Sequence, residues 1–253
     1  MKEPTRSTRF DKLRRLTPSR VRFDASDHAP GLDAVLDFQA SHARARDAIH
    51  RSVDWDSIIA DLAPHTALRL ESKAGERKTY LSRPDFGREL SDRSLLALDG
   101  MRVEGPVVVL ADGLSSFAVQ SHGAALFQAL TALIPELGNA PVFLVEQARV
   151  AIADQIGASV GATATFMLIG ERPGLSVSDS LGAYFTWAPD PGLQDSRRNC
   201  VSNIHANDGL SIRDAAARLA WVWQEARKLG TSGVTLKDMS GMQKAIASER
   251  SGE

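Results

Sequence analysis

From about residue 100 onward, short runs rich in β-branched and apolar residues alternate with longer segments that have helical periodicity. Short strands that alternate with helices of this length are typical of a parallel sheet covered on both faces. The pattern therefore predicts an α/β fold with a doubly wound, mostly parallel, Rossmann-like sheet. The expected strands are residues 107–111, 142–145 and 163–169, and the expected helices are residues 119–134, 150–160 and 212–229.

The first hundred residues have a different texture. Residues 32–50 are helix formers without proline or internal glycine, and Val35, Phe38 and Ile49 fall on one side of a helical wheel. A second helix is expected at residues 55–63. The predicted organisation is a basic N-terminal tail, a small helical N-terminal domain and an α/β domain, over residues 1–30, 31–99 and 100–253.

Polar residues lie along the same side of the first helix as its apolar residues, at Gln39, His42, Arg46 and His50. A surface helix normally shows apolar side chains there, so these polar groups need partners. Either they form a partly exposed flank with local hydrogen bonds, or they contact another chain or a ligand. Their spacing does not distinguish these alternatives.

The charges nearly cancel, with 30 Lys and Arg against 31 Asp and Glu. Because no global field attracts polyanions, neither nucleic acid nor a membrane is expected as a partner. Cys200 is the single cysteine, so no internal disulfide forms, and the histidines lack the spacing of a zinc site. The longest apolar run is far shorter than the roughly 20 residues of a membrane span, and residues 1–20 are too polar for a secretory signal. We therefore expect a cytoplasmic protein without a metal site.

Three loops directly follow the predicted strands, at residues 112–116, 146–149 and 170–174. In an open parallel sheet, ligands bind beyond the carboxyl ends of the strands, so we expect the polar residues of these loops to converge there. The third loop is bounded by glycine and proline and presents Glu171 and Arg172. These two side chains form either a ligand site or a plain turn with a solvated ion pair.

Common enzyme signatures fail at the places where they would be expected. Ser115 follows a strand as a hydrolase nucleophile does, but Phe117 occupies the position of that motif's second glycine. Gly157 and Gly161 lack the spacing of a dinucleotide-binding loop, and no Walker A sequence occurs. Cys200 has no indicated base, which favours a small, buried, inert cysteine over a nucleophile.

Several stretches are informative through the exact order of their residues, which composition alone does not explain. The first reads LDFQASHARARDA at residues 36–48, and YLSRPD follows at residues 80–85. The others are ADGLS at residues 111–115, a long stretch over residues 148–204 that contains GERPGLS at residues 170–176, and SGVTLKD at residues 232–238. In this order, they resemble the small (light) subunit of ethanolamine ammonia-lyase.

The resemblance implies a subunit of an adenosylcobalamin-dependent lyase that converts ethanolamine into acetaldehyde and ammonia by a radical rearrangement. It implies assembly with a larger, catalytic subunit, with the cofactor between the two and no catalytic residue on this chain. The family's cofactor contacts match Val150, Glu171 and Cys200, with Arg149 adjacent, so residues 100–253 would form the cobalamin-binding domain. In organisms that build bacterial microcompartments, the tail of residues 1–30 would be a candidate packaging signal.

Each of the four residues has an expected role. Glu171 can accept hydrogen bonds from the amide side chains around a corrin ring, and Arg149 can donate to their oxygens. Val150 supplies apolar contact, and Cys200 packs through its small size. Two alternatives stay open: a stand-alone cobalamin-binding or carrier protein, and a hydrolase that uses Ser115.

Overall fold

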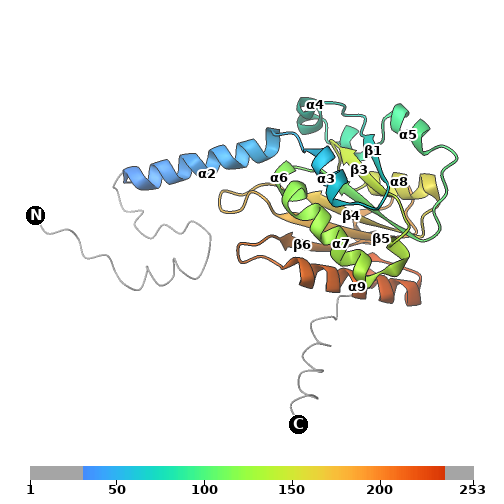
Figure 1. Ribbon diagram of the computed structural model, residues 1–253. Helices are drawn as coiled ribbons and strands as arrows, with labels where there is room; N and C mark the ends of the chain where they lie inside the picture. The colour runs from blue at the N-terminus through green and yellow to red at the C-terminus, as the bar shows by residue number, and fades with distance from the viewer. Residues whose placement is uncertain (1–30, 237–253) are drawn as a thin grey trace, which may run out of the picture.

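The computed structural model describes residues 31–236 and is organised around one six-stranded sheet (Figure 1). The strands are β1 (Ala67–Glu71), β2 (Pro106–Ala111), β3 (Val142–Glu146), β4 (Ala164–Gly170), β5 (Leu181–Trp187) and β6 (Arg198–Ile204). They lie in the order β1-β3-β2-β4-β5-β6. The first four strands in this order are parallel, whereas β5 runs antiparallel to β4 and β6 antiparallel to β5. The sheet is therefore mixed, and the expected α/β fold is confirmed.

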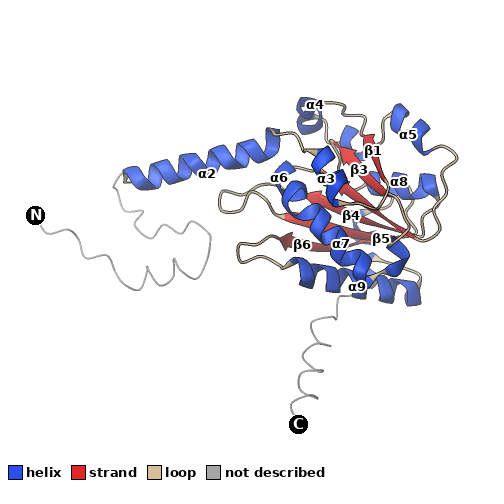
Figure 2. Ribbon diagram, viewed as in Figure 1, coloured by secondary structure: helices blue, strands red, loops and turns tan. Residues whose placement is uncertain are grey.

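Helices cover both faces of the sheet (Figure 2). They are α2 (Leu32–His50), α3 (Trp55–Asp61), α4 (Arg77–Ser82), α5 (Asp92–Leu98), α6 (Ser116–Ala118), α7 (Ala124–Leu133), α8 (Ile152–Val160) and α9 (Ile212–Leu229). Shorter helical turns are η1 (Phe86–Arg88), η2 (Val119–Gly123), η3 (Pro135–Leu137), η4 (Asp195–Arg197) and η5 (Gly233–Thr235). Helices α3, α6, α7 and α9 pack on one face, and α5 and α8 pack on the other.

The two faces are covered unequally, and this determines where a cavity can form. On the α7 and α9 face, the rings of Phe166, Phe185 and Trp223 pack together, with the two phenylalanine centroids 5.0 Å apart. The core on the α5 and α8 face takes its buried residues from β1 to β4, and from β5 it takes only the partly buried Tyr184. On β5 and β6, α8 reaches this second face only where its Asp154 pairs with Arg198. Among the described residues, helices leave the part of the face around Tyr184 and Cys200 open.

The last helix follows the sequence prediction closely. The Ser211 side chain accepts a hydrogen bond from the Asp214 backbone N–H at 3.1 Å, as an N-cap does. Gly230 ends the helix in the left-handed conformation at φ 65°, which glycine adopts without steric cost. The apolar side of α9, with Leu219 and Trp223, is buried on the sheet. Local capping signals and periodicity were sufficient to locate this helix.

Three strands were not expected. β1 lies between residues 31 and 99, where the sequence indicated only helices, and it forms the edge of the sheet beside β3. β5 and β6 follow the last predicted strand and extend the sheet at its other edge. The predicted tail of residues 1–30 lies outside the described residues, as do residues 237–253. Within the described part of the chain, no helix combines the length and apolar character needed to span a membrane.

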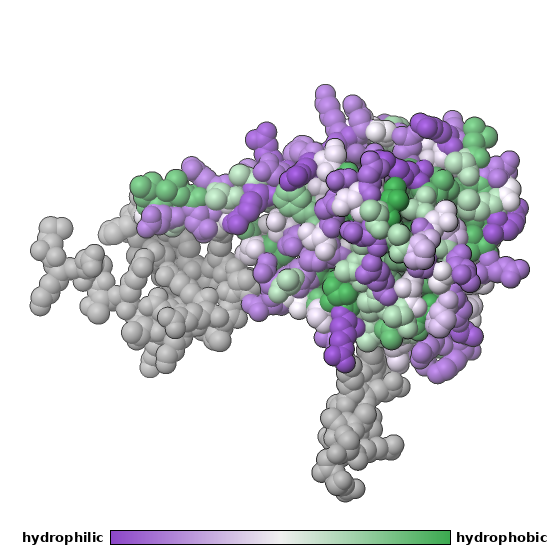
Figure 3. Space-filling model, viewed as in Figure 1, coloured by the Kyte–Doolittle hydropathy of each residue, from purple (hydrophilic) through white to green (hydrophobic). Residues whose placement is uncertain are grey.

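Helix α2 projects from the body of the molecule (Figure 1). Its carboxyl end is fixed there, because the Ser116 hydroxyl donates to the Ala48 carbonyl at 3.1 Å and the Arg77 guanidinium donates to the Ile49 carbonyl at 2.5 Å. At the other end, Leu32 and Leu36 are 72% and 52% exposed. Figure 3 shows hydrophobic surface on this projecting end.

Candidate functional site

The loops that follow β2, β3 and β4 converge, as the sequence predicted. The Asp112 carboxylate accepts hydrogen bonds from the backbone N–H groups of Gln147 and Ala148 at 2.9 and 3.1 Å. The Leu114 N–H donates to the Gly170 carbonyl at 2.9 Å. These bonds join all three loops at one edge of the sheet, because β2, β3 and β4 are parallel.

Arg77 crosses this edge from α4 and connects the loops to the N-terminal part of the fold. Its Nη1 donates to the Asp112 carboxylate at 3.3 Å, to the Gly113 carbonyl at 2.8 Å and to the Gln147 side chain at 3.2 Å. Burial raises the pKa of Asp112 to about 6, although the nearby Arg77 favours the ionised carboxylate. The network positions the loops that carry the predicted site residues.

A cavity of about 530 Å³ opens beside this edge, over the part of β5 and β6 that carries Tyr184 and Cys200. Three of the four predicted cofactor-binding residues line it, namely Arg149, Val150 and Cys200. The full lining consists of Pro84, Asp85, Arg88, Arg149, Val150, Tyr184, Asp195, Arg198 and Cys200. The structure therefore brings together residues that are widely separated in the sequence.

Arg149 is held in place by a tyrosine and a glycine. Its guanidinium carbon lies 4.4 Å from the centroid of the Tyr80 ring, and its backbone N–H donates to the Gly87 carbonyl at 2.7 Å. A Cβ atom on Gly87 would approach Arg149 Cγ to 2.9 Å and the Tyr80 ring to 3.0 Å, so only glycine fits without displacement. Burial raises the pKa of Tyr80, and its hydroxyl donates to the Ala148 carbonyl at 2.9 Å. Arg149 Nε is buried without a hydrogen-bond partner among the described residues.

Cys200 is exposed, and our expectation of a buried cysteine was wrong. It lies on the edge strand β6, opposite Tyr184 of β5, where no described helix covers the face of the two strands. Partial burial in the cavity still raises the pKa of the Cys200 thiol, and the nearby Glu171 carboxylate raises it further. The raised pKa keeps this thiol protonated at neutral pH.

Glu171 lies next to this cavity and is not part of its lining. Its carboxylate accepts hydrogen bonds from the Ser180 hydroxyl at 2.5 Å and from the Asn203 backbone N–H at 3.3 Å. A Cβ atom on Gly182 would approach Glu171 Oε1 to 3.0 Å, so the carboxylate lies against β5. Arg172 forms no ion pair with Glu171, which removes the interpretation of this turn as a solvated ion pair.

Two features of the cavity were missed by the sequence analysis. Arg88 is one of its cationic groups, and it is placed there by the hydrogen bond between Arg149 and the preceding Gly87. Arg198 also lines the cavity and forms a buried ion pair with Asp154 of α8, both side chains being at most 3% exposed. No local pattern indicates either contact, because both join residues far apart in the chain.

The hydroxyl of Ser115 is used structurally. It donates to the Ser178 carbonyl at 2.6 Å and accepts from the Ala118 N–H at 3.3 Å, and the residue is fully buried. His122 hydrogen-bonds Asp179 at 3.1 Å. A buried N-cap hydroxyl is not available to attack a substrate, so the structure does not support the hydrolase alternative. Within residues 31–236, no group of three or more potential ligands is arranged to hold a metal ion.

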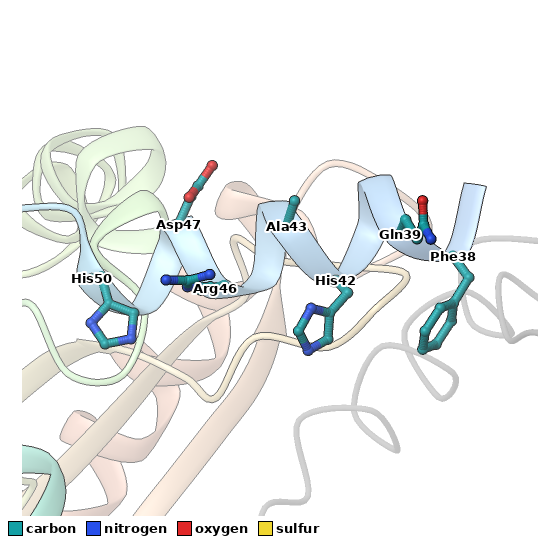
Figure 4. A pocket seen from close by; sticks show the side chains of 7 residues that line it. All are labelled: Phe38, Gln39, His42, Ala43, Arg46, Asp47 and His50. Carbon is teal, nitrogen blue, oxygen red and sulfur yellow. The ribbon is translucent and has the colours of Figure 1, made fainter. Parts of the chain in front are cut away.

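A second cavity, of about 510 Å³, lies along the projecting helix α2. Figure 4 shows Phe38, His42 and His50 on one side of the helix and Ala43 and Asp47 on the other. The rings of Phe38 and His42 stack with centroids 6.3 Å apart. The four polar residues singled out in the sequence of this helix, Gln39, His42, Arg46 and His50, are therefore exposed on α2. All the described residues that line this cavity belong to the same helix.

Comparison with known proteins identifies the family. The family model described as "Ethanolamine ammonia-lyase light chain (EutC)" matches residues 7–237. The ethanolamine ammonia-lyase small subunit of Pseudomonas syringae pv. tomato is 46% identical over 236 residues, which cover 90% of this chain and 82% of that protein. The protein of the same name from Rhodopseudomonas palustris is 45% identical over 241 residues, covering 93% and 92% of the two chains. The small subunit of Pseudomonas fluorescens strain Pf-5 is 44% identical over 259 residues, which cover 98% and 94%. This chain therefore belongs to the ethanolamine ammonia-lyase light chain family, whose members are subunits of a lyase.

Proposed function

We propose that this chain is the small subunit of an adenosylcobalamin-dependent ethanolamine ammonia-lyase and forms one wall of the cobalamin site. The assembled enzyme would convert ethanolamine into acetaldehyde and ammonia, with the reacting groups held by a large catalytic subunit. One observation carries the proposal: three residues that match the family's cofactor contacts or adjoin them, Arg149, Val150 and Cys200, line one cavity. The fourth, Glu171, lies beside it.

The cavity has the properties of half a binding site. A volume of about 530 Å³ is enough for a drug-sized molecule or one part of a larger one, and a whole cobalamin needs a second wall. The buried Arg149 Nε is an unsatisfied donor that suits an acceptor on a ligand. The cofactor, when bound, would supply the radical chemistry, and the protein would supply position and environment.

Each residue then acts through its ordinary chemistry. Arg149, fixed against Tyr80, donates hydrogen bonds to acceptor oxygens of the cofactor. The Glu171 carboxylate has more acceptor lone pairs than the hydrogen bonds from Ser180 and Asn203 use. Its remaining lone pairs accept hydrogen bonds from amide N–H groups of the cofactor. Val150 and the protonated Cys200 provide a small, weakly polar surface, with no thiolate required.

Binding to a large subunit is supported by the shape of the chain. The open face of β5 and β6 and the projecting helix α2 both present surface that a monomer would normally cover. The exposed Leu32 and Leu36 on α2 belong to the kind of apolar surface that marks protein contacts. We place the resulting hetero-oligomer in the cytoplasm, or within a microcompartment where the organism builds one.

Reconstitution tests this proposal. The chain is co-expressed with a candidate large subunit, the complex is purified, and acetaldehyde release from ethanolamine is measured with and without adenosylcobalamin. Activity should require both subunits and the cofactor. Tight cobalamin retention by the chain alone, without any gain from the partner, would instead favour a stand-alone cobalamin carrier.

A further inference from the structure

Charged side chains are unevenly paired around the cavity. Asp85 is bound by Arg83, through contacts of 3.0 and 2.6 Å. Arg198 is bound by Asp154 and by Asp195. The two other cationic residues of the lining, Arg88 and Arg149, form no ion pair with any described residue. The cavity wall therefore holds two guanidinium groups whose donors are available to a ligand.

The backbone brings these two arginines to the same part of the wall. Arg149 N–H donates to the carbonyl of Gly87, the residue that precedes Arg88. Arg88 lies near enough to the buried Asp154 to favour its ionised form, but it makes no direct contact with it. Arg149 is oriented in advance by its stacking on Tyr80. Preorganised guanidinium groups are well suited to phosphate, which they bind through paired hydrogen bonds.

Cobalamin carries one phosphate group, the phosphodiester of its nucleotide loop, whereas the side chains around its corrin ring are neutral amides. We propose that Arg88 and Arg149 form the subsite for this phosphodiester. The inference rests on the proposed function and makes it more specific, because it states which part of the cofactor faces this chain. Arg88 becomes a binding residue in addition to the four that match or adjoin the family's contacts.

Truncated forms of the ligand test the subsite directly. Cyanocobalamin contains the whole nucleotide loop, cobinamide phosphate keeps a phosphate without the base, and cobinamide lacks both. Dissociation constants are measured on the complex with the large subunit by the change in corrin absorbance. Arg88→Gln should weaken binding of cyanocobalamin and of cobinamide phosphate about tenfold, the loss of one charge-assisted hydrogen bond, and leave cobinamide binding unchanged. Raising the ionic strength should weaken the same two ligands.

Two further variants control the experiment. Arg93→Gln makes the same charge change on α5, outside the cavity lining, and should alter none of the three constants. Arg88→Lys keeps the charge and should recover part of the lost affinity. Equal weakening of all three ligands by Arg88→Gln, or weakening of none, would overturn the phosphodiester assignment. Failure of the unmodified complex to bind cyanocobalamin would instead reject the proposed function itself.

Discussion

Gly87 offers a sharp test of how Arg149 is positioned. Its backbone is not in the left-handed region, so alanine is allowed there, but the added Cβ would meet Arg149 Cγ at 2.9 Å and the Tyr80 ring at 3.0 Å. Tyr80 is fully buried and cannot move freely. Gly87→Ala should therefore push the Arg149 side chain away from the ring, because that side chain is the more adjustable of the two neighbours.

The expected cost follows from these contacts. Overpacking of this kind lowers the free energy of unfolding by about 1–3 kcal/mol, and the lost contact between guanidinium and ring accounts for about 0.5–2 kcal/mol of it. Loss of a charge-assisted hydrogen bond from Arg149 would also weaken cobalamin binding by the complex about tenfold. Urea unfolding of the chain and absorbance titration of the complex measure the two effects.

A double-mutant cycle separates the clash with Arg149 from other effects. Arg149→Ala removes Cγ, so Gly87→Ala should destabilise the chain less in that background than in the wild type. Gly174→Ala is the matched control, because its added Cβ would come no closer than 3.4 Å to the Val177 carbonyl oxygen, and it should change the free energy of unfolding by no more than about 0.5 kcal/mol. Unchanged stability and cobalamin affinity in Gly87→Ala would refute the positioning argument.

Two other predictions concern stability. Arg198→Met should lower the free energy of unfolding by about 3–5 kcal/mol, measured by urea unfolding, because it leaves the buried Asp154 without its cation; a loss below 1 kcal/mol would show that the pair is not buried in solution. The pKa of Asp112 is about 6 in the folded chain and about 4 in the unfolded chain. The folded state therefore binds this proton more tightly, and the contribution of Asp112 to stability should fall by up to about 3 kcal/mol between pH 4 and pH 7. Asp112→Asn should abolish that part of the pH dependence, and an unchanged pH profile would contradict it.

The sequence predicted those parts of the fold that depend on local signals. Helix α9 has a serine N-cap, a regular apolar side and a terminal glycine, and its predicted limits agree with the structure. β2 and β4 are wholly buried, and their apolar runs are visible without knowledge of the fold. β6 has exposed polar residues on an edge, and its sequence carries no comparable signal. Its place in the sheet depends on pairing with β5, which local patterns do not specify.

In the candidate site too, the residues placed by local signals were predicted, and those placed by long-range strand pairing were not. Arg149 and Glu171 were expected at the carboxyl ends of strands, because parallel strands bring their following loops to one edge. Cys200 and Tyr184 belong to antiparallel strands beyond that edge, so strand order could not locate them. Cys200 was predicted to be buried because cysteines usually are, whereas the open face of β6 leaves it exposed. The resemblance to a family supplied the residue that physical reasoning had set aside.

If the cavity of this chain is one wall of a shared cobalamin site, as we propose, the single cysteine of the chain, Cys200, reports on that wall. The measurement is the rate of Cys200 alkylation in the complex with the large subunit, followed by mass spectrometry of the small-subunit peptide with and without saturating cyanocobalamin. Because its pKa is raised, the thiol should react slowly at neutral pH and faster as the pH increases. Cobalamin should slow the reaction strongly at every pH. Equal rates with and without cobalamin would contradict the account.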